Sequence, residues 1–167
     1  VIGHNSYDVV ILDDITEGAA QTILQAKDLI NDDTPLMTMN SDQLVDWDIE
    51  RLFEMCEQFD GVIPCFYGEG NAWSYARTLD NGYVQEVAEK KQISKYATAG
   101  YYYWKKGSDF VKYAEQMIED NSRTNGEFYV APVYNWAVKD GKRVGVFMVD
   151  KCYSLGTPED LEEYLNG

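Results

Sequence analysis

The sequence is poor in histidine and cysteine, the residue types that most often bind zinc or take part in nucleophilic catalysis. It has one histidine, His4, and three widely spaced cysteines, Cys56, Cys65 and Cys152. A lone histidine argues against a serine–histidine–aspartate triad, and the scattered cysteines match no zinc-binding spacing. An odd number of separated cysteines fits reduced thiols better than a disulfide framework, so we expect a cytoplasmic protein.

Positive charge is scarce as well. The 14 Lys and Arg against 29 Asp and Glu give a net charge of −15. Residues 1–76 hold two basic and fifteen acidic residues, whereas residues 77–167 hold twelve and fourteen. Nucleic-acid binding needs clustered cations, so this balance argues against a nucleic-acid partner. A local cation or a metal ion could still bind the phosphates of a nucleotide.

Long apolar runs are missing too, since none approaches the ~20 residues that cross a bilayer. We therefore expect no membrane partner. The hydrophobic fraction of 45% is nevertheless that of a folded globular protein. The length of 167 residues suits one domain over residues 1–167.

The apolar periodicity predicts alternating strands and helices. Strands are expected at 9–12, 36–39, 62–67, 101–104 and 144–149, and helices at 19–30, 49–56, 110–118 and from Thr157-Pro158 onward. Segments 73–78 and 83–87 flank Asn81-Gly82, a pair that favours a tight hairpin. The strand–helix alternation predicts right-handed crossovers, and the hairpin makes the sheet mixed. The predicted fold is α/β, with a mixed, mostly parallel sheet and helices on both faces.

Asp42 is the most informative polar residue, because it follows the predicted strand 36–39. In open α/β sheets, ligands bind just beyond the carboxyl ends of strands. A carboxylate there can hold a divalent cation that bridges phosphates. An aspartate after a strand is as often a turn or helix cap, and the spacing leaves both interpretations open.

Other polar segments have weaker signals. Asp46-Trp47-Asp48 matches the Asp-any-Asp pattern of metal-dependent glycosyltransferases, although Asp46 also fits as the cap of the helix at 49–56. Segment 16–20 could bring backbone close to a flat ligand, or simply pack a helix on the sheet. Glu89-Lys90-Lys91 could bind hydroxyls and phosphate, or be a solvated run of charges. The aromatic run 101–104 fits a sheet core better than a stacking surface.

Seven segments, taken in order, resemble the sugar-phosphate nucleotidyltransferases. The resemblance runs from about Asp8 to the end and is greatest to the capsule- and lipopolysaccharide-type branch, similar to glucose-1-phosphate thymidylyltransferases. The segments are Thr16-Glu17-Gly18-Ala19-Ala20, Asn40-Ser41-Asp42-Gln43, Trp73-Ser74-Tyr75-Ala76, Glu89-Lys90, Thr98-Ala99-Gly100-Tyr101-Tyr102, Asn125-Gly126-Glu127-Phe128-Tyr129 and Leu155-Gly156-Thr157-Pro158-Glu159-Asp160-Leu161.

The resemblance implies a Rossmann-like, GT-A-like nucleotidyltransferase fold and a reaction. A nucleoside triphosphate and a sugar 1-phosphate would give a nucleotide sugar and pyrophosphate, with Mg²⁺. Asp42 would be the metal ligand and, with Lys90 facing phosphate, a catalytic residue. Gly18 would lie against the nucleotide base, with Glu17 nearby.

The resemblance also implies a sugar pocket. Glu89 would accept hydrogen bonds from sugar hydroxyls, and Ala76 stands near the sugar where relatives often have glycine. Gly100 and Tyr102 would line the pocket, and Glu127 would support the same wall.

The sequence departs from the family pattern in two places. The family opens with a strand and a glycine-rich, arginine-containing loop, and no such segment precedes Asp8. Relatives often place an acidic second metal ligand just before the Gly-Thr-Pro-Glu turn, where this sequence has Ser154. We interpret the chain as N-terminally truncated by about two ~30-residue strand–helix units. Because the missing strand would be central, we expect self-association, recruitment of another segment, or local rearrangement.

Two other functions stay open at this stage. A glycosyltransferase would use Asp46-Trp47-Asp48. A non-catalytic remnant would keep the fold and bind a sugar nucleotide without turnover.

Overall fold

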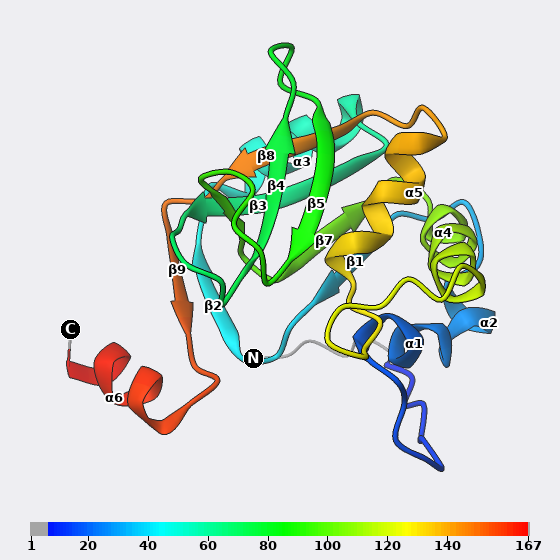
Figure 1. Cartoon of the computed structure of the whole chain (residues 1–167), viewed down its shortest axis with the longest axis horizontal. Helices are drawn as coiled ribbons and strands as arrows, with labels where there is room; N and C mark the ends of the chain where they lie inside the picture. The colour runs from blue at the N-terminus through cyan, green and yellow to red at the C-terminus, as the bar shows by residue number, and fades with distance from the viewer. Residues whose placement is uncertain (1–6, 167) are drawn as a thin grey trace.

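The computed structural model describes residues 7–166 and is built on a seven-stranded mixed sheet (Figure 1). The strand order is β1–β7–β3–β6–β4–β5, and β8 pairs with the free side of β3. The strands are β1 (Leu36–Met39), β3 (Gly61–Tyr67), β4 (Ser74–Thr78), β5 (Val84–Glu89), β6 (Tyr96–Thr98), β7 (Tyr101–Trp104) and β8 (Val144–Met148).

The mixed α/β fold is confirmed, but the expected parallel majority is wrong. Among the strands of residues 7–166, β3 and β8 form the one parallel pair, and the other pairings are antiparallel. β4 and β5 form an antiparallel hairpin. β6 and β7 both pair with β3 and run antiparallel to it. Antiparallel neighbours need no crossover helix, so this part of the sheet forms without one.

Helices cover both faces of the sheet, as predicted. On one face lie α1 (Ala19–Leu24), α4 (Gly107–Glu119) and α5 (Tyr134–Lys139), which share a buried cluster with Ile63 and Trp104. On the other face lies α3 (Ile49–Gln58), which packs through Leu52 onto Val62 and Tyr103. Neighbouring residues of β3 and β7 thus serve opposite clusters, because side chains alternate along a strand.

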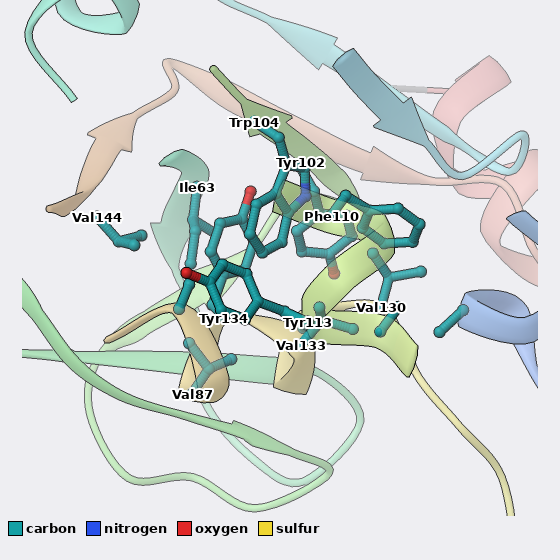
Figure 2. Close-up of a cluster of buried hydrophobic side chains, with 14 of the residues drawn as sticks. Ile63, Val87, Tyr102, Trp104, Phe110, Tyr113, Val130, Val133, Tyr134 and Val144 are labelled. Atoms are coloured by element: carbon teal, nitrogen blue, oxygen red, sulfur yellow. The ribbon is translucent and has the colours of Figure 1, made fainter. Parts of the chain in front are cut away.

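Aromatic rings fill the larger cluster (Figure 2). The ring of Trp104 stacks on Tyr134 with centroids 4.0 Å apart and planes 7° from parallel. The Tyr134 hydroxyl donates to the Tyr103 carbonyl at 2.7 Å, so this buried hydroxyl has a hydrogen-bond partner. Phe110 packs edge-on against Trp104 from α4. The aromatic run at 101–104 is therefore core, as its composition predicted.

A two-stranded ribbon and one further helix lie outside the main sheet, and the ribbon packs through Val45 and Cys152 against the smaller cluster. The ribbon pairs β2 (Gln43–Asp46) with β9 (Lys151–Ser154). Helix α6 (Pro158–Asn166) follows β9 at one end of the molecule and has no buried residue (Figure 1). Thr157 caps it, since the Thr157 hydroxyl accepts from the Asp160 amide at 3.1 Å. None of the helices in residues 7–166 has the length and apolarity of a membrane span.

Several local predictions are corrected. Segment 9–12 is not a strand; its side chains are exposed, Ile11 by 84%, and it has no neighbouring strand to pair with among the described residues. The helix at 19–30 is split into α1 and the short α2 (Lys27–Ile30) by a turn. Asp48, not Asp46, caps α3, accepting from the Arg51 amide at 3.1 Å. His4 lies outside the described residues.

The hairpin between β4 and β5 is present, but its turn differs from the expected one. Only Gly82 takes a positive φ, of 83°, while Asn81 does not. The Asn81 side chain instead accepts from the Tyr83 amide at 3.1 Å. Such a local bond supports a longer loop, so the strands begin pairing at Thr78 and Val84.

Candidate functional site

A cavity of about 400 Å³ lies beside the ends of β1, β5 and β6. Five of the predicted site residues line it: Asp42, Glu89, Lys90, Gly100 and Tyr102. These residues come from three separate stretches of the sequence. The fold therefore collects them at one place, as a ligand site requires.

One side of the cavity, here called the sheet wall, consists of Ser74, Glu89, Thr98 and Tyr102 on four strands of the main sheet. The Ser74 hydroxyl donates to the Glu89 carboxylate, and the hydroxyls of Thr98 and Tyr102 lie 3.0 Å apart. Burial raises the pKa of Glu89, although Ser74 and Lys90 act to lower it. Burial also raises the pKa of the Tyr102 phenol, which therefore stays protonated at neutral pH. The wall presents hydroxyls and one carboxylate, which suits a polyhydroxylated ligand.

Lys90 lies next to the sheet wall at the end of β5, in a left-handed conformation with φ 51°. Its amide donates to the Trp73 carbonyl at 3.0 Å, which fixes the backbone. Its ammonium donates to the Tyr129 hydroxyl at 2.8 Å and lies 5.0 Å from the centre of that ring. The hydrogen bond to Tyr129 raises the pKa of Lys90, so the ammonium stays charged at neutral pH.

Gly100 lines the cavity in a left-handed backbone conformation that favours glycine. Its φ is 75°, and a Cβ at this position would fall 1.4 Å from Oε1 of Gln43. The Gly100 carbonyl also accepts from the Asn40 amide at 2.9 Å. These contacts fasten the segment that carries Asp42 to the end of β6 and β7.

The opposite side, here called the ribbon wall, consists of Asp42, Ser154 and Asp160. The Asp42 backbone carbonyl accepts from the Leu155 amide at 2.8 Å, while its exposed carboxylate lines the cavity. None of the ion pairs among residues 7–166 involves Asp42 or Asp160. Carboxylate and hydroxyl oxygens are the donors that a hard divalent cation such as Mg²⁺ prefers, so this donor set fits that ion.

Four predicted site residues lie elsewhere. Ala76 is fully buried in the core, so its side chain offers no surface to a ligand. Glu17 binds Arg123 through an ion pair of 3.1 Å and does not line the cavity. Gly18 packs on the backbone of Phe128, where a Cβ would fall 2.5 Å from the carbonyl oxygen. Glu127 is exposed just outside the lining.

Sequence reasoning did not single out Ser74, Thr98, Tyr129 or Asp160, although all four line the cavity. Each lies inside a segment that carries the family resemblance. Their side chains share no spacing that marks them, because they come together only when the strands pair. Asp46 and Asp48 do not line the cavity.

Comparison with known proteins adds to this geometry. The family described as nucleotidyl transferase matches residues 7–166. Among curated proteins, no sequence matches the chain.

Three solved structures share the fold. The nucleoside-diphosphate-sugar pyrophosphorylase from Vibrio cholerae RC9 superposes with a TM-score of 0.77 at 23% identity, over 93% of this chain and 68% of that one. A Bacillus anthracis protein, assigned as a glucose-1-phosphate thymidylyltransferase and solved with sucrose, gives 0.71 at 18%, over 90% and 61%. A UDP-glucose pyrophosphorylase complexed with UDP-glucose gives 0.72 at 17%, over 90% and 61%. The chain thus spans 61% to 68% of the length of these proteins.

Proposed function

The chain belongs to the nucleotidyl transferase family, and we propose that it acts in the joining of a nucleoside triphosphate to a sugar 1-phosphate. The products are a nucleotide sugar and pyrophosphate. The observation that carries the proposal is the single cavity that brings Asp42, Glu89 and Lys90 together. The names of two structural relatives, a nucleoside-diphosphate-sugar pyrophosphorylase and a UDP-glucose pyrophosphorylase, agree with it.

The proposed reaction is an in-line displacement at phosphorus. A phosphate oxygen of the sugar 1-phosphate forms a bond to the α-phosphorus of the triphosphate, and the bond to pyrophosphate breaks. Positioning and charge neutralisation account for most of the catalysis in such transfers. A bound Mg²⁺ supplies charge neutralisation on the phosphates.

The residues of the cavity divide this work by their chemistry. Glu89, with the hydroxyl of Ser74 bound to it, accepts hydrogen bonds from sugar hydroxyls. Lys90, whose ammonium is bound to Tyr129 next to the sheet wall, would pair with the phosphate of the sugar 1-phosphate. Asp42, on the ribbon wall, would hold the metal ion that neutralises charge on the phosphates. By the family resemblance, Gly18 and Glu17 would lie at the base end of the nucleotide. Neither lines the cavity, but the next residue, Ala19, does.

We also propose the setting of the reaction. The sequence resembles the capsule- and lipopolysaccharide-type branch of the family. The nucleotide sugar would therefore supply capsule or lipopolysaccharide biosynthesis, in the cytoplasm. Self-association is proposed as well, because β1 ends the described sheet with one edge unpaired and Met39 63% exposed. An unpaired apolar edge favours pairing with another strand.

The test of the function is synthesis of nucleotide sugar from triphosphate and sugar 1-phosphate with Mg²⁺, in the whole chain and in variants. Asp42→Asn should lower turnover about 10³-fold, because a metal ion supplies several kcal/mol of charge stabilisation. The matched control is Asp46→Asn, which removes a carboxylate from the neighbouring strand without touching the cavity.

Three results would replace this proposal. Turnover that is indifferent to Asp42→Asn would remove the metal assignment. Sugar transfer to an acceptor that depends on Asp48 would indicate a glycosyltransferase. Binding of a nucleotide sugar without turnover under every condition would indicate a non-catalytic binding module.

A further inference from the structure

The ribbon wall contains a carboxylate that the proposed function has not used. Asp160, in the first turn of α6, is half-buried and lines the same cavity as Asp42. Its Oδ2 accepts a hydrogen bond from the Ser154 hydroxyl at 2.9 Å. Ser154 is the position where the family resemblance led us to expect an acidic residue. The carboxylate that is absent there is thus present 2.9 Å away, on the next element of the chain.

Helix capping does not account for the orientation of this side chain. An acid three residues after a threonine cap ordinarily turns back to bond the cap amide. Here the Thr157 hydroxyl accepts from the Asp160 amide, which is half of that arrangement. The Asp160 carboxylate bonds to Ser154 instead, on the side of the cavity.

Asp42 and Ser154 are held close together by the ribbon. Gln43 lies opposite Ser154 in the β2–β9 pairing, and the Leu155 amide donates to the Asp42 carbonyl at 2.8 Å. Gly156 leaves a space between them: a Cβ there would fall 3.0 Å from Asp42 Oδ2 and 3.8 Å from Ser154 Oγ. A side chain at residue 156 would therefore fill a space bordered by oxygen atoms.

We propose that Asp160 is the second carboxylate ligand of the divalent cation and that Ser154 is its positioning residue. The inference rests on the metal ion of the proposed function. Residues 7–166 contain no cluster of three or more histidine, cysteine, aspartate or glutamate side chains able to hold a metal. A pair of carboxylates suits Mg²⁺, which keeps several waters and is completed by substrate phosphates.

The test is direct binding of Mn²⁺, followed by electron paramagnetic resonance of the free ion, with Mg²⁺ as competitor and no substrate present. Asp160→Asn should weaken Mn²⁺ binding by at least about tenfold, as should Asp42→Asn. Ser154→Ala should weaken binding by a smaller factor, because it frees Asp160 without removing it. The control is Glu163→Gln, which makes the same charge change on the same helix but lies outside this cavity, and it should leave binding unchanged.

A second variant separates ligation from a general loss of charge. The Ser154 hydroxyl already lies beside the Asp160 carboxylate, so the carboxylate introduced by Ser154→Asp should reach the same space. Adding Ser154→Asp to Asp160→Asn should restore most of the Mn²⁺ affinity. Because α6 has no buried residue, thermal unfolding should be the same in all these variants.

The outcomes separate this inference from the proposed function. Weaker binding in Asp42→Asn but not in Asp160→Asn would overturn the role of Asp160 and leave the function in place. Equal weakening in Glu163→Gln and Asp160→Asn would also overturn it, since charge alone would explain the result. A chain that does not bind Mn²⁺ at all would overturn the second ligand and the metal assignment together.

Discussion

The two walls of the cavity differ in what supports them. The sheet wall is carried by four strands of the main sheet, and Ser74, Thr98 and Tyr102 are buried there. The ribbon wall is carried by a two-stranded ribbon and by a helix with no buried residue. The sheet wall is therefore fixed by the core. The ribbon wall depends on hydrogen bonds and on the partly buried Val45 and Cys152, which pack at the margin of the smaller cluster.

This difference suits the two kinds of ligand that we propose. A sugar is selected by hydroxyl positions, so the groups that recognise it must be held before it arrives. A metal ion binds its own ligands strongly and can draw carboxylates into place. We thus expect the sheet wall to keep its structure without ligand and the ribbon wall to become more ordered when the metal ion binds.

The largest effect is expected from the core beneath the sheet wall. Trp104→Ala removes a fully buried ring that stacks on Tyr134, and it should lower the free energy of unfolding by about 3–5 kcal/mol. Leu165→Ala, in α6 and 71% exposed, should change it by no more than about 0.5 kcal/mol. Urea unfolding followed by tryptophan fluorescence measures both. Comparable losses would contradict the division between the two walls.

A smaller effect concerns the pH dependence of the sheet wall. The pKa of Glu89 is raised by burial, so its carboxylate becomes protonated at a higher pH than an exposed glutamate. Affinity for sugar 1-phosphate should fall as pH decreases through this raised pKa, because a protonated Glu89 accepts hydroxyl hydrogen bonds poorly. Glu89→Gln should remove this component and weaken binding roughly tenfold at neutral pH.

Calorimetric titrations of the parent and Glu89→Gln chains over one pH range measure the effect. The phosphate of the ligand titrates equally in both, so the difference between the two curves belongs to Glu89. A raised pKa also means that the charged form of Glu89 lowers stability, and this cost increases as pH rises through the pKa. Glu89→Gln should therefore unfold no more readily at neutral pH. Parallel affinity curves would contradict the assignment.

The smallest effect concerns the bond between Lys90 and Tyr129. Tyr129→Phe keeps the ring under the ammonium and removes the hydroxyl that accepts from it. The KM for sugar 1-phosphate should rise by roughly 3- to 10-fold with little change in kcat, since Lys90 remains but is less well placed. Tyr67→Phe is the control, because Lys95 lies over that ring away from the cavity. An unchanged KM would mean that the proposed function does not use the bond.

Some of this arrangement could be predicted from the sequence. Asp42 was identified because it follows a short apolar strand, and strands, helices and the aromatic core were predicted from local periodicity. The sheet wall could not be predicted as a unit, because Ser74, Thr98 and Tyr102 meet only through strand pairing. Segment 9–12 was predicted as a strand from apolarity alone, and apolarity does not supply a partner. The extent of one domain over residues 1–167 stays a prediction.

The parallel pair in the centre of the sheet has a consequence for biosynthesis. β3 pairs Gly61 with Val144 and Cys65 with Met148, so β3 meets this neighbour only after about 80 further residues have been made. On a ribosome, β3 would be made long before β8 leaves the exit tunnel. Contacts this distant in sequence form slowly. We expect nascent chains that stop short of β8 to depend on chaperones, and productive folding of the sheet to wait until β8 has been made.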